Sequence, residues 1–410
     1  MNLKRPLVFS TDFTVSAILC LYAASLYFSD RTVIIATVLL VAAGAALIVR
    51  RVAVGQRPLS RPHPLVYGWL AVYLVRVVWL LLSNDPLYGL RWLDTGLPFI
   101  LFPLLFQYLP VSERALRTTL VFFVRFTFLF CAITLLTVAW HCVAVPIDAG
   151  EWLRSPKAYY PLAYAWTNED HPSFLCIVYL SALPAAFFLK RRYGAVSTVE
   201  IGALVAVEAA VLAFTGARVG FIILPALLLL MALCDMPFRR KIVIAGTLTA
   251  LAGGLVAGLW GREHSFTDRF KDPIRVQLWE TAVASIKERP LLGTGTGGMR
   301  EALRSPEIAG KLGYSKPQPF SYPHNQYLGE VMHFGFIGAI PLFCTLACLL
   351  ALAFRRKDVL LQSFLLMLSI FMFSEMPFDS HKGINFALFF ISLLVAQRQM
   401  SAGKPKTTAV

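Results

Sequence analysis

Residues 321–338 read SYPHNQYLGEVMHFGFIG, and within this stretch a polar loop gives way to an apolar helix. The pair His324-Asn325 sits at the change, and Gly335 and Gly338 follow in the apolar part. An imidazole at a membrane surface can accept a proton from a substrate that a lipid carries. The stretch therefore predicts a membrane helix that begins beside a candidate catalytic base.

Apolar runs of this kind recur along the whole chain. Hydrophobic residues occupy 57% of its 410 positions and charged residues only 15%, which is outside the usual balance of a soluble protein. About 20 apolar residues in a helix cross a bilayer. We therefore predict an all-α, polytopic integral membrane protein of about twelve transmembrane helices, with eleven as the alternative count. The expected spans are 11–29, 32–49, 64–83, 96–110, 118–145, 172–189, 199–215, 218–235, 242–260, 325–354, 359–375 and 383–397.

Basic residues cluster on one side of this twelve-span arrangement. Short loops rich in Lys and Arg stay in the cytoplasm, so both termini are expected there. The clusters also account for the formal net charge of +15, which makes a nucleic-acid partner unnecessary. The residues concerned are Lys4, Arg5, Arg50, Arg51, Arg57, Arg61, Arg114, Arg117, 190–192, 239–241, 355–357, Arg398, Lys404 and Lys406.

The predicted spans divide the chain into three parts. Residues 1–260 hold the first nine helices, 261–324 form a long outer loop domain, and 325–410 hold the last three helices and a cytoplasmic tail. Asp272-Pro273 predicts a helix start in the loop, because Asp is a good N-cap and Pro suits the first helical position. The apolar residues expected to share one face of this helix are Val276, Trp279, Val283 and Ile286.

The run LLGTGTGG follows this helix at residues 291–298. No Lys-Ser/Thr pair comes after it, so a nucleotide-binding loop is disfavoured. A flexible connector and tight packing against the membrane domain are the two remaining readings. The seven cysteines all lie in or at the edges of apolar spans, which indicates neither a disulfide framework nor a zinc site. We therefore expect chemistry without a metal or a cofactor.

Two arginines on the outer side of the membrane each have two interpretations, one structural and one functional. Arg218 opens a span on the outer side, where it either snorkels to lipid phosphates or binds a substrate phosphate through its planar guanidinium. Arg275 falls in the first turn of the loop helix, as a solvated surface residue or a phosphate ligand. Neither alternative is decided by the residues alone.

Other charges lie inside or between the spans. Arg76, Arg125 and Glu208 fall within apolar segments, which suggests either an intramembrane Arg–Glu pair or charges along a substrate path. Glu375 and Asp379 come in the last outer turn, where they could orient His324 or an acceptor hydroxyl.

His324 is the candidate base. Pro323 is predicted to begin the tenth span, which would put His324 in the first helical turn, where the helix dipole favours a neutral imidazole. Gly335 is then expected on about the same helical face, since eleven residues return to within about 20°. A glycine there would admit a neighbouring helix or a lipid chain.

Three motifs resemble those of a known family. His324-Asn325, nine residues, Gly335, two residues and Gly338 resemble the signature of the O-antigen ligases, within the family that they share with O-antigen polymerases. Arg218 with Ile222 resembles the family's Arg-x-x-x-Leu motif, with Ile for Leu. The stretch from Arg275 to Gly295 is similar to its long outer loop, and the twelve-span layout fits as well.

The resemblance implies a metal-independent, inverting glycosyltransferase of the GT-C type. Members join a polysaccharide carried on undecaprenyl pyrophosphate to lipid A-core oligosaccharide at the periplasmic face of the inner membrane. By the resemblance, His324 is the general base, while Arg218, Arg275 and Asn325 bind substrate, with membrane lipids as surroundings.

Three alternatives stay open at this point. An O-antigen polymerase would use another polyprenyl-linked chain as acceptor, and a protein O-oligosaccharyltransferase would use a Ser or Thr side chain. A lipid-carrier flippase would catalyse no transfer, but it would be expected to show internal repeats, and none is convincing in this sequence.

Overall fold

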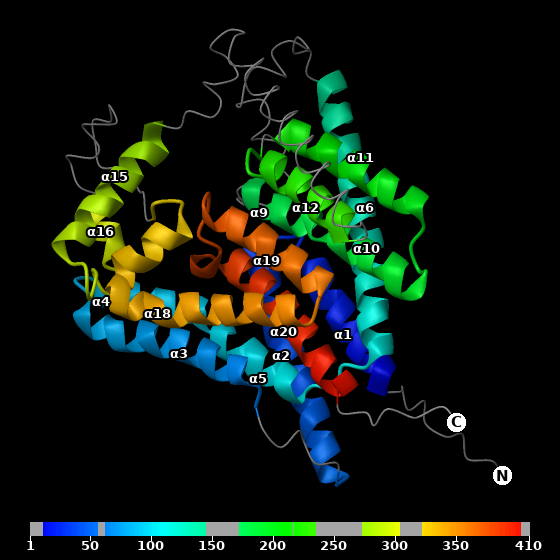
Figure 1. Ribbon diagram of the computed structural model, residues 1–410, viewed down its shortest axis with the longest axis horizontal. Coiled ribbons are helices and arrows are strands. Elements are labelled where there is room, and N and C mark those ends of the chain that lie inside the picture. The colour runs from blue at the N-terminus through cyan, green and yellow to red at the C-terminus, as the bar shows by residue number, and fades with distance from the viewer. Residues whose placement is uncertain are drawn as a thin grey trace.

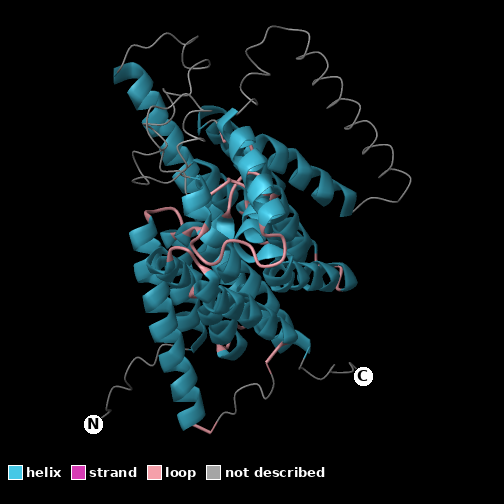
Figure 2. Cartoon of the chain, turned by 90° about the vertical axis from the view of Figure 1, so that its left-hand side faces the viewer, coloured by secondary structure: helices cyan, strands magenta, loops and turns pink. Residues whose placement is uncertain are grey.

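The computed structural model describes residues 11–55, 62–144, 172–215, 217–234, 273–303 and 322–402, and every regular element in these ranges is a helix (Figure 2). In chain order they are α1 (Thr11–Ser25), α2 (Asp30–Ala53), α3 (Pro64–Trp79), η1 (Leu80–Leu82), α4 (Pro86–Gly96), α5 (Pro98–Tyr108), α6 (Glu113–Ala144), α9 (Pro172–Leu180), α10 (Ala182–Tyr193), α11 (Thr198–Thr215), α12 (Gly220–Cys234), α15 (Pro273–Glu288), α16 (Met299–Leu303), α18 (Gln326–Arg355), α19 (Val359–Met372), η2 (Pro377–Asp379) and α20 (His381–Ala402).

The expected all-α, polytopic membrane class is confirmed. Six described segments are long and apolar enough to cross a membrane: Asp30–Ala53, Pro64–Leu82, Pro86–Tyr108, Glu113–Thr137, Ser173–Tyr193 and Gln326–Arg355. Four shorter apolar helices accompany them: Thr11–Ser25, Gly220–Cys234, Val359–Met372 and His381–Ala396. The predicted span 242–260 and the proposed cap Asp272 lie outside the described residues, so the count of twelve stays a prediction.

Two expected spans differ in detail from the sequence reading. The fourth, predicted at 96–110, is the second half of a longer apolar segment in which α4 and α5 meet at Leu97. The sixth is interrupted at Ser181, between α9 and α10. Pro98 and Pro184 lie near these breaks, and a proline removes a backbone donor, which favours such interruptions.

Helix α20 forms the centre of the molecule (Figure 1). Its residues 382–396 are all buried, as expected of a helix that other helices surround. The Asn385 amide oxygen accepts from Tyr22 Oη of α1 at 3.1 Å and from Thr37 Oγ1 of α2 at 2.7 Å. A polar group in an apolar core needs such partners, so this pair of bonds ties the N-terminal helices to α20.

Helix α18 runs alongside α3 and contains a break at Gly335, which has φ 63° and ψ −178° (Figure 1). The segment after α15 supplies the backbone bonds that the break removes. Phe336 N donates to Pro290 O at 2.8 Å, while Thr294 N and Gly295 N donate to the carbonyls of residues 332 and 333 at 3.0 and 2.9 Å. We call these bonds the 290–295 clasp.

The clasp decides two sequence readings. The glycine-rich run packs tightly against the membrane domain, so its reading as a flexible connector is wrong. A Cβ on Gly335 would lie 2.2 Å from Leu291 O, and one on Gly293 would lie 2.5 Å from His333 O. The expectation that Gly335 continues the His324 face of a regular helix is also wrong, because its positive φ interrupts the helix and the clasp fills the space beside it.

Candidate active site

Helix α18 begins at Gln326, one residue after the predicted span bound at 325 and three residues after the predicted start at Pro323. Asn325 is its N-cap, and the Asn325 side-chain oxygen accepts from Leu328 N at 3.1 Å. His324 therefore precedes the helix, in the left-handed region with φ 52°, and its placement in the first helical turn was wrong. Asn is among the best N-cap residues, which explains why the helix starts after the His-Asn pair and not at Pro323.

The His324 side chain lies against a buried carboxylate. Its Nδ1 is 3.0 Å from Glu375 Oε2, and its ring meets the Tyr322 ring edge to face at 4.6 Å between centroids. The His324 side chain is 24% exposed, whereas Glu375 is only 1% exposed. A carboxylate accepts a hydrogen bond from Nδ1–H, so in this tautomer the lone pair of the neutral ring is on Nε2.

Arg275 of α15 holds the other oxygen of the same carboxylate. Its Nη2 lies 2.9 Å from Glu375 Oε1, and its Nη1 donates to the carbonyl of Ser374. The Arg275 side chain is 23% exposed, so it belongs to a built cluster and not to a plain solvated surface. Glu375 thus bridges His324 and Arg275, and of the two acidic residues expected to orient His324 it is the one that contacts the ring.

Helix α15 positions both partners of Glu375. Trp279 Nε1 donates to Pro323 O at 2.9 Å, which fixes the residue directly before His324. The buried face of α15 is formed by Leu278 and Ala282, while Val276 and Val283 are exposed. The predicted apolar face was therefore wrong for Val276 and Val283, because Leu278 packs into a cluster with residues of α4, α16 and α18 that the loop sequence did not reveal. Ile286 of the predicted face does pack against this cluster.

Arg218 comes from another part of the chain. It is exposed in the turn that precedes α12, and α12 packs on α19. The His324 cluster itself is built from α15, the start of α18 and the connection between α19 and α20, where His324 and Arg275 meet around Glu375.

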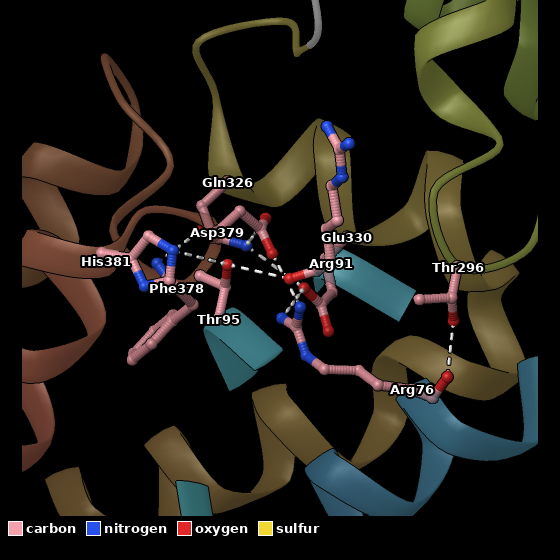
Figure 3. A network of polar contacts seen from close by, with 9 residues as sticks. All are labelled: Arg76, Arg91, Thr95, Thr296, Gln326, Glu330, Phe378, Asp379 and His381. Atoms are coloured by element: carbon pink, nitrogen blue, oxygen red, sulfur yellow. Dashed lines mark hydrogen bonds and ion pairs between the residues drawn. The ribbon is translucent and has the colours of Figure 1, made fainter. Parts of the chain in front are cut away.

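A second polar cluster, whose charged side chains are buried, surrounds Arg76 (Figure 3). Arg76 Nη1 is 2.7 Å from Asp379 Oδ1, and Arg76 Nη2 is 3.5 Å from Glu330 Oε2. Gln326 Nε2 donates to Asp379 Oδ2 at 2.8 Å and to Glu330 Oε2 at 3.1 Å. Gln326 Oε1 accepts from Phe378 N at 3.0 Å, so this Arg76 cluster joins α3, α18 and η2.

The Arg76 cluster corrects one sequence reading. An intramembrane Arg–Glu pair does form, but Arg76 pairs with Glu330 and Asp379 and not with Glu208, because α3 packs on α18. Arg125 of α6 pairs instead with Glu200 at 3.5 Å on an exposed surface. His333 is buried against Trp92 at 4.4 Å between ring centroids, as expected of a packing residue.

Fold and site together define a polytopic helical membrane protein with a His–Glu–Arg cluster at the start of a spanning helix. Residues 202–343 match the family model described as O-antigen ligase, and the matched segment contains Arg218, Arg275, His324 and Asn325. This match supports membership of the O-antigen ligase/polymerase family.

One relative among the curated proteins is an uncharacterized protein of Haemophilus influenzae. The two are 26% identical over 174 residues, which is 38% of this chain and 43% of that protein. The chain thus spans less than half of the length of this relative. In the part of the chain that the structure describes, no group of three His, Cys, Asp or Glu side chains is placed to hold a metal ion.

Proposed function

We propose that the protein is an O-antigen ligase of the GT-C type. It would transfer a polysaccharide from undecaprenyl pyrophosphate to a sugar hydroxyl of lipid A-core oligosaccharide, with inversion and without a metal ion. The observation that carries the proposal is the His324–Glu375 pair at 3.0 Å, within the segment that matches the O-antigen ligase family. Residues 261–324 would form the periplasmic domain, with both termini in the cytoplasm.

His324 would act as the general base. The acceptor oxygen attacks the anomeric carbon, its proton moves to His324 Nε2, and the bond from that carbon to the pyrophosphate oxygen breaks with its electron pair on the leaving group. Glu375 accepts a hydrogen bond from Nδ1–H and stabilises the imidazolium that forms, in the way a carboxylate supports a catalytic histidine elsewhere. General-base assistance of this kind is worth about 10²–10⁴-fold in rate.

The arginines would stabilise the pyrophosphate as it leaves. Arg275 binds Ser374 and Glu375 through Nη1 and Nη2, and its partly exposed positive charge would face the substrate. Arg218 would bind the same group from its exposed turn before α12. Asn325 caps α18 through its oxygen, and its amide nitrogen would donate to the substrate.

The acceptor that receives the glycan distinguishes the possible activities within this family. Purified wild-type protein and His324→Ala would be given polyprenyl-pyrophosphate-linked glycan with lipid A-core, with a second polyprenyl-linked glycan, or with a Ser/Thr peptide, without added metal. Transfer to lipid A-core that is lost in folded His324→Ala supports the ligase. His63→Asn is the matched control, since it removes an imidazole beside Arg356 at the far end of α18 and keeps an N-cap acceptor for α3.

Other outcomes would replace the proposal. Transfer only to polyprenyl-linked glycan would make the protein a polymerase, and transfer only to the peptide would make it an oligosaccharyltransferase. Lipid movement across vesicles without any transfer would make it a flippase. Ligase activity that persists in His324→Ala would remove His324 as the base.

A further inference from the structure

A groove runs along the exposed face of α6, away from the His324 cluster. Its volume is ≈ 670 Å³, and its lining residues recur at the spacing of one helical face. They are Arg117, Thr118, Val121, Phe122, Arg125, Phe126 and Leu129 of α6, with Ala195 from the turn after α10. The groove begins near the N-terminal end of α6, which extends along one side of the molecule (Figure 1).

Two arginines lie on this groove, two helical turns apart. Between Arg117 and Arg125 the helix rises about 12 Å. The Arg117 guanidinium lies over the Tyr193 ring at 5.5 Å, and Arg125 is 3.5 Å from Glu200. The Arg125 side chain is 63% exposed, so the ion pair leaves most of its guanidinium surface accessible.

The surroundings of the groove are strongly basic. Glu200 lies 3.5 Å from Arg125 of the groove, and Glu113 lies 3.3 Å from Arg192, which is outside the groove lining. Basic residues outnumber them on the adjoining ends of α6 and α10, and these are Arg114, Arg117, Arg125, Lys190, Arg191 and Arg192. The groove therefore attracts an anion, and a single exposed carboxylate partner does not neutralise it.

The rest of the groove is apolar and faces the bilayer. Glu113–Thr137 is one of the segments able to span a membrane, and Phe128 and Leu129 are 40% and 54% exposed on its surface. An arginine on such a surface is costly unless an anionic group meets it. A lipid supplies both an anion for the arginines and a cover for the apolar surface, because its phosphate carries negative charge and its acyl chains cover apolar side chains. Basic pockets on the cytoplasmic side of membrane helices bind acidic phospholipids in this way.

We propose that this groove is a binding site for an anionic glycerophospholipid. The phosphate lies between Arg117 and Arg125, and the acyl chains lie on Val121, Phe126 and Leu129. In the proposed orientation the lipid belongs to the cytoplasmic leaflet of the membrane. Glycosyl transfer would occur on the opposite, periplasmic side. The binding does not depend on the proposed glycosyl transfer.

Native mass spectrometry of the purified full chain tests the proposal. The protein in detergent is titrated with phosphatidylglycerol and, separately, with phosphatidylethanolamine. We expect wild type to bind phosphatidylglycerol selectively, and Arg117→Gln/Arg125→Gln to bind it about tenfold more weakly or worse, since each basic residue at a membrane surface contributes to anionic-lipid affinity. The matched control is Arg50→Gln/Arg51→Gln, which removes two charges in the last turn of α2.

A second variant keeps the test independent of the arginines. Ala195→Trp would fill the groove without a change in charge, and we expect it to weaken phosphatidylglycerol binding as well. The proposal is overturned if phosphatidylethanolamine binds equally well, if the Arg50/Arg51 control loses as much affinity as the groove variant, or if both groove variants retain wild-type binding.

Discussion

Glu375 and Asp379 stand four positions apart in the chain, yet they belong to two clusters with different character. Asp379 joins Arg76, Glu330 and Gln326 in a network whose charged side chains are about 1–2% exposed. Glu375 is equally buried, but its partners His324 and Arg275 are 24% and 23% exposed. Both clusters pair arginine with carboxylate, and only one has faces that a substrate can reach.

This difference in exposure indicates which cluster stabilises the fold and which one is available for chemistry. A buried charge network joins elements together, and removing one member leaves another charge uncompensated in the interior. In the other cluster the carboxylate is buried, while the His and Arg side chains that it contacts are partly exposed. Such a cluster keeps hydrogen-bonding capacity for another molecule. The variants below separate the two roles, in order of expected effect.

Removal of the candidate base should have the largest effect on activity. In His324→Ala we expect kcat for glycosyl transfer to fall by about 10³-fold or more, at the upper part of the range for general-base catalysis. The melting temperature in detergent should change little, because the side chain is partly exposed and its polar contact is with Glu375. Wild-type turnover in this variant would mean that the open cluster is not the reactive one.

Asp379→Asn should affect stability instead. It removes the anion that lies 2.7 Å from Arg76 in the interior, and breaking a buried pair in this way costs about 3–5 kcal/mol. Thermal unfolding would show a large fall in the melting temperature, and activity per folded molecule should stay within about threefold of wild type at low temperature. If activity is lost while the melting temperature is unchanged, the Arg76 cluster takes part in the reaction.

Glu375→Gln should give an intermediate effect on activity. The glutamine keeps the size of the side chain but removes the charge that stabilises the protonated His324, so kcat should fall by about 10²-fold. The KM for the acceptor should stay near the wild-type value, because the acceptor binds outside this buried residue. A change confined to KM would instead assign Glu375 to substrate binding through Arg275.

The 290–295 clasp links the two clusters, since it joins the end of α15 to the break in α18. Gly335→Ala should destabilise the protein by about 1–3 kcal/mol, because the positive φ is strained for alanine and the new Cβ would lie 2.2 Å from Leu291 O. Gly202→Ala is the matched control within α11, where a Cβ meets nothing within 4 Å. The control should be neutral or slightly stabilising in thermal unfolding. An equal change in melting temperature for the two substitutions would show that Gly335 is not required at this position of the clasp.

The smallest effect concerns pH and lies outside both clusters. Burial, aided by Arg356, lowers the pKa of His63, which caps α3 through Nδ1. The folded state then favours the neutral ring, so this contribution to stability is complete above the unfolded pKa near 6.5 and is lost as the pH falls toward the folded value. Wild type should lose slightly more melting temperature than His63→Asn between pH 7.5 and 5. An equal loss would place the pH dependence on other groups.

Much of the architecture and part of the site could be predicted from local sequence. The length and apolar character of the runs are local properties, and they predicted the helical membrane class. The Asp-Pro pair predicted the start of the loop helix at Pro273. The His-Asn pair indicated His324 as a candidate and the first turn of the loop helix indicated Arg275, and the structure places both around one carboxylate. The helix start was misjudged by a few residues, because capping by Asn325 competed with Pro323 for that position.

The sequence by itself determined that this chain is a bundle of apolar helices with charged residues at a few defined places, because hydrophobic length and composition act residue by residue. Only the tertiary structure decided which charges meet. Glu375 lies 51 positions from His324, and Asp379 lies 303 positions from Arg76. Such contacts depend on which helices pack together and on where the break at Gly335 turns the chain, and no local pattern contains that information.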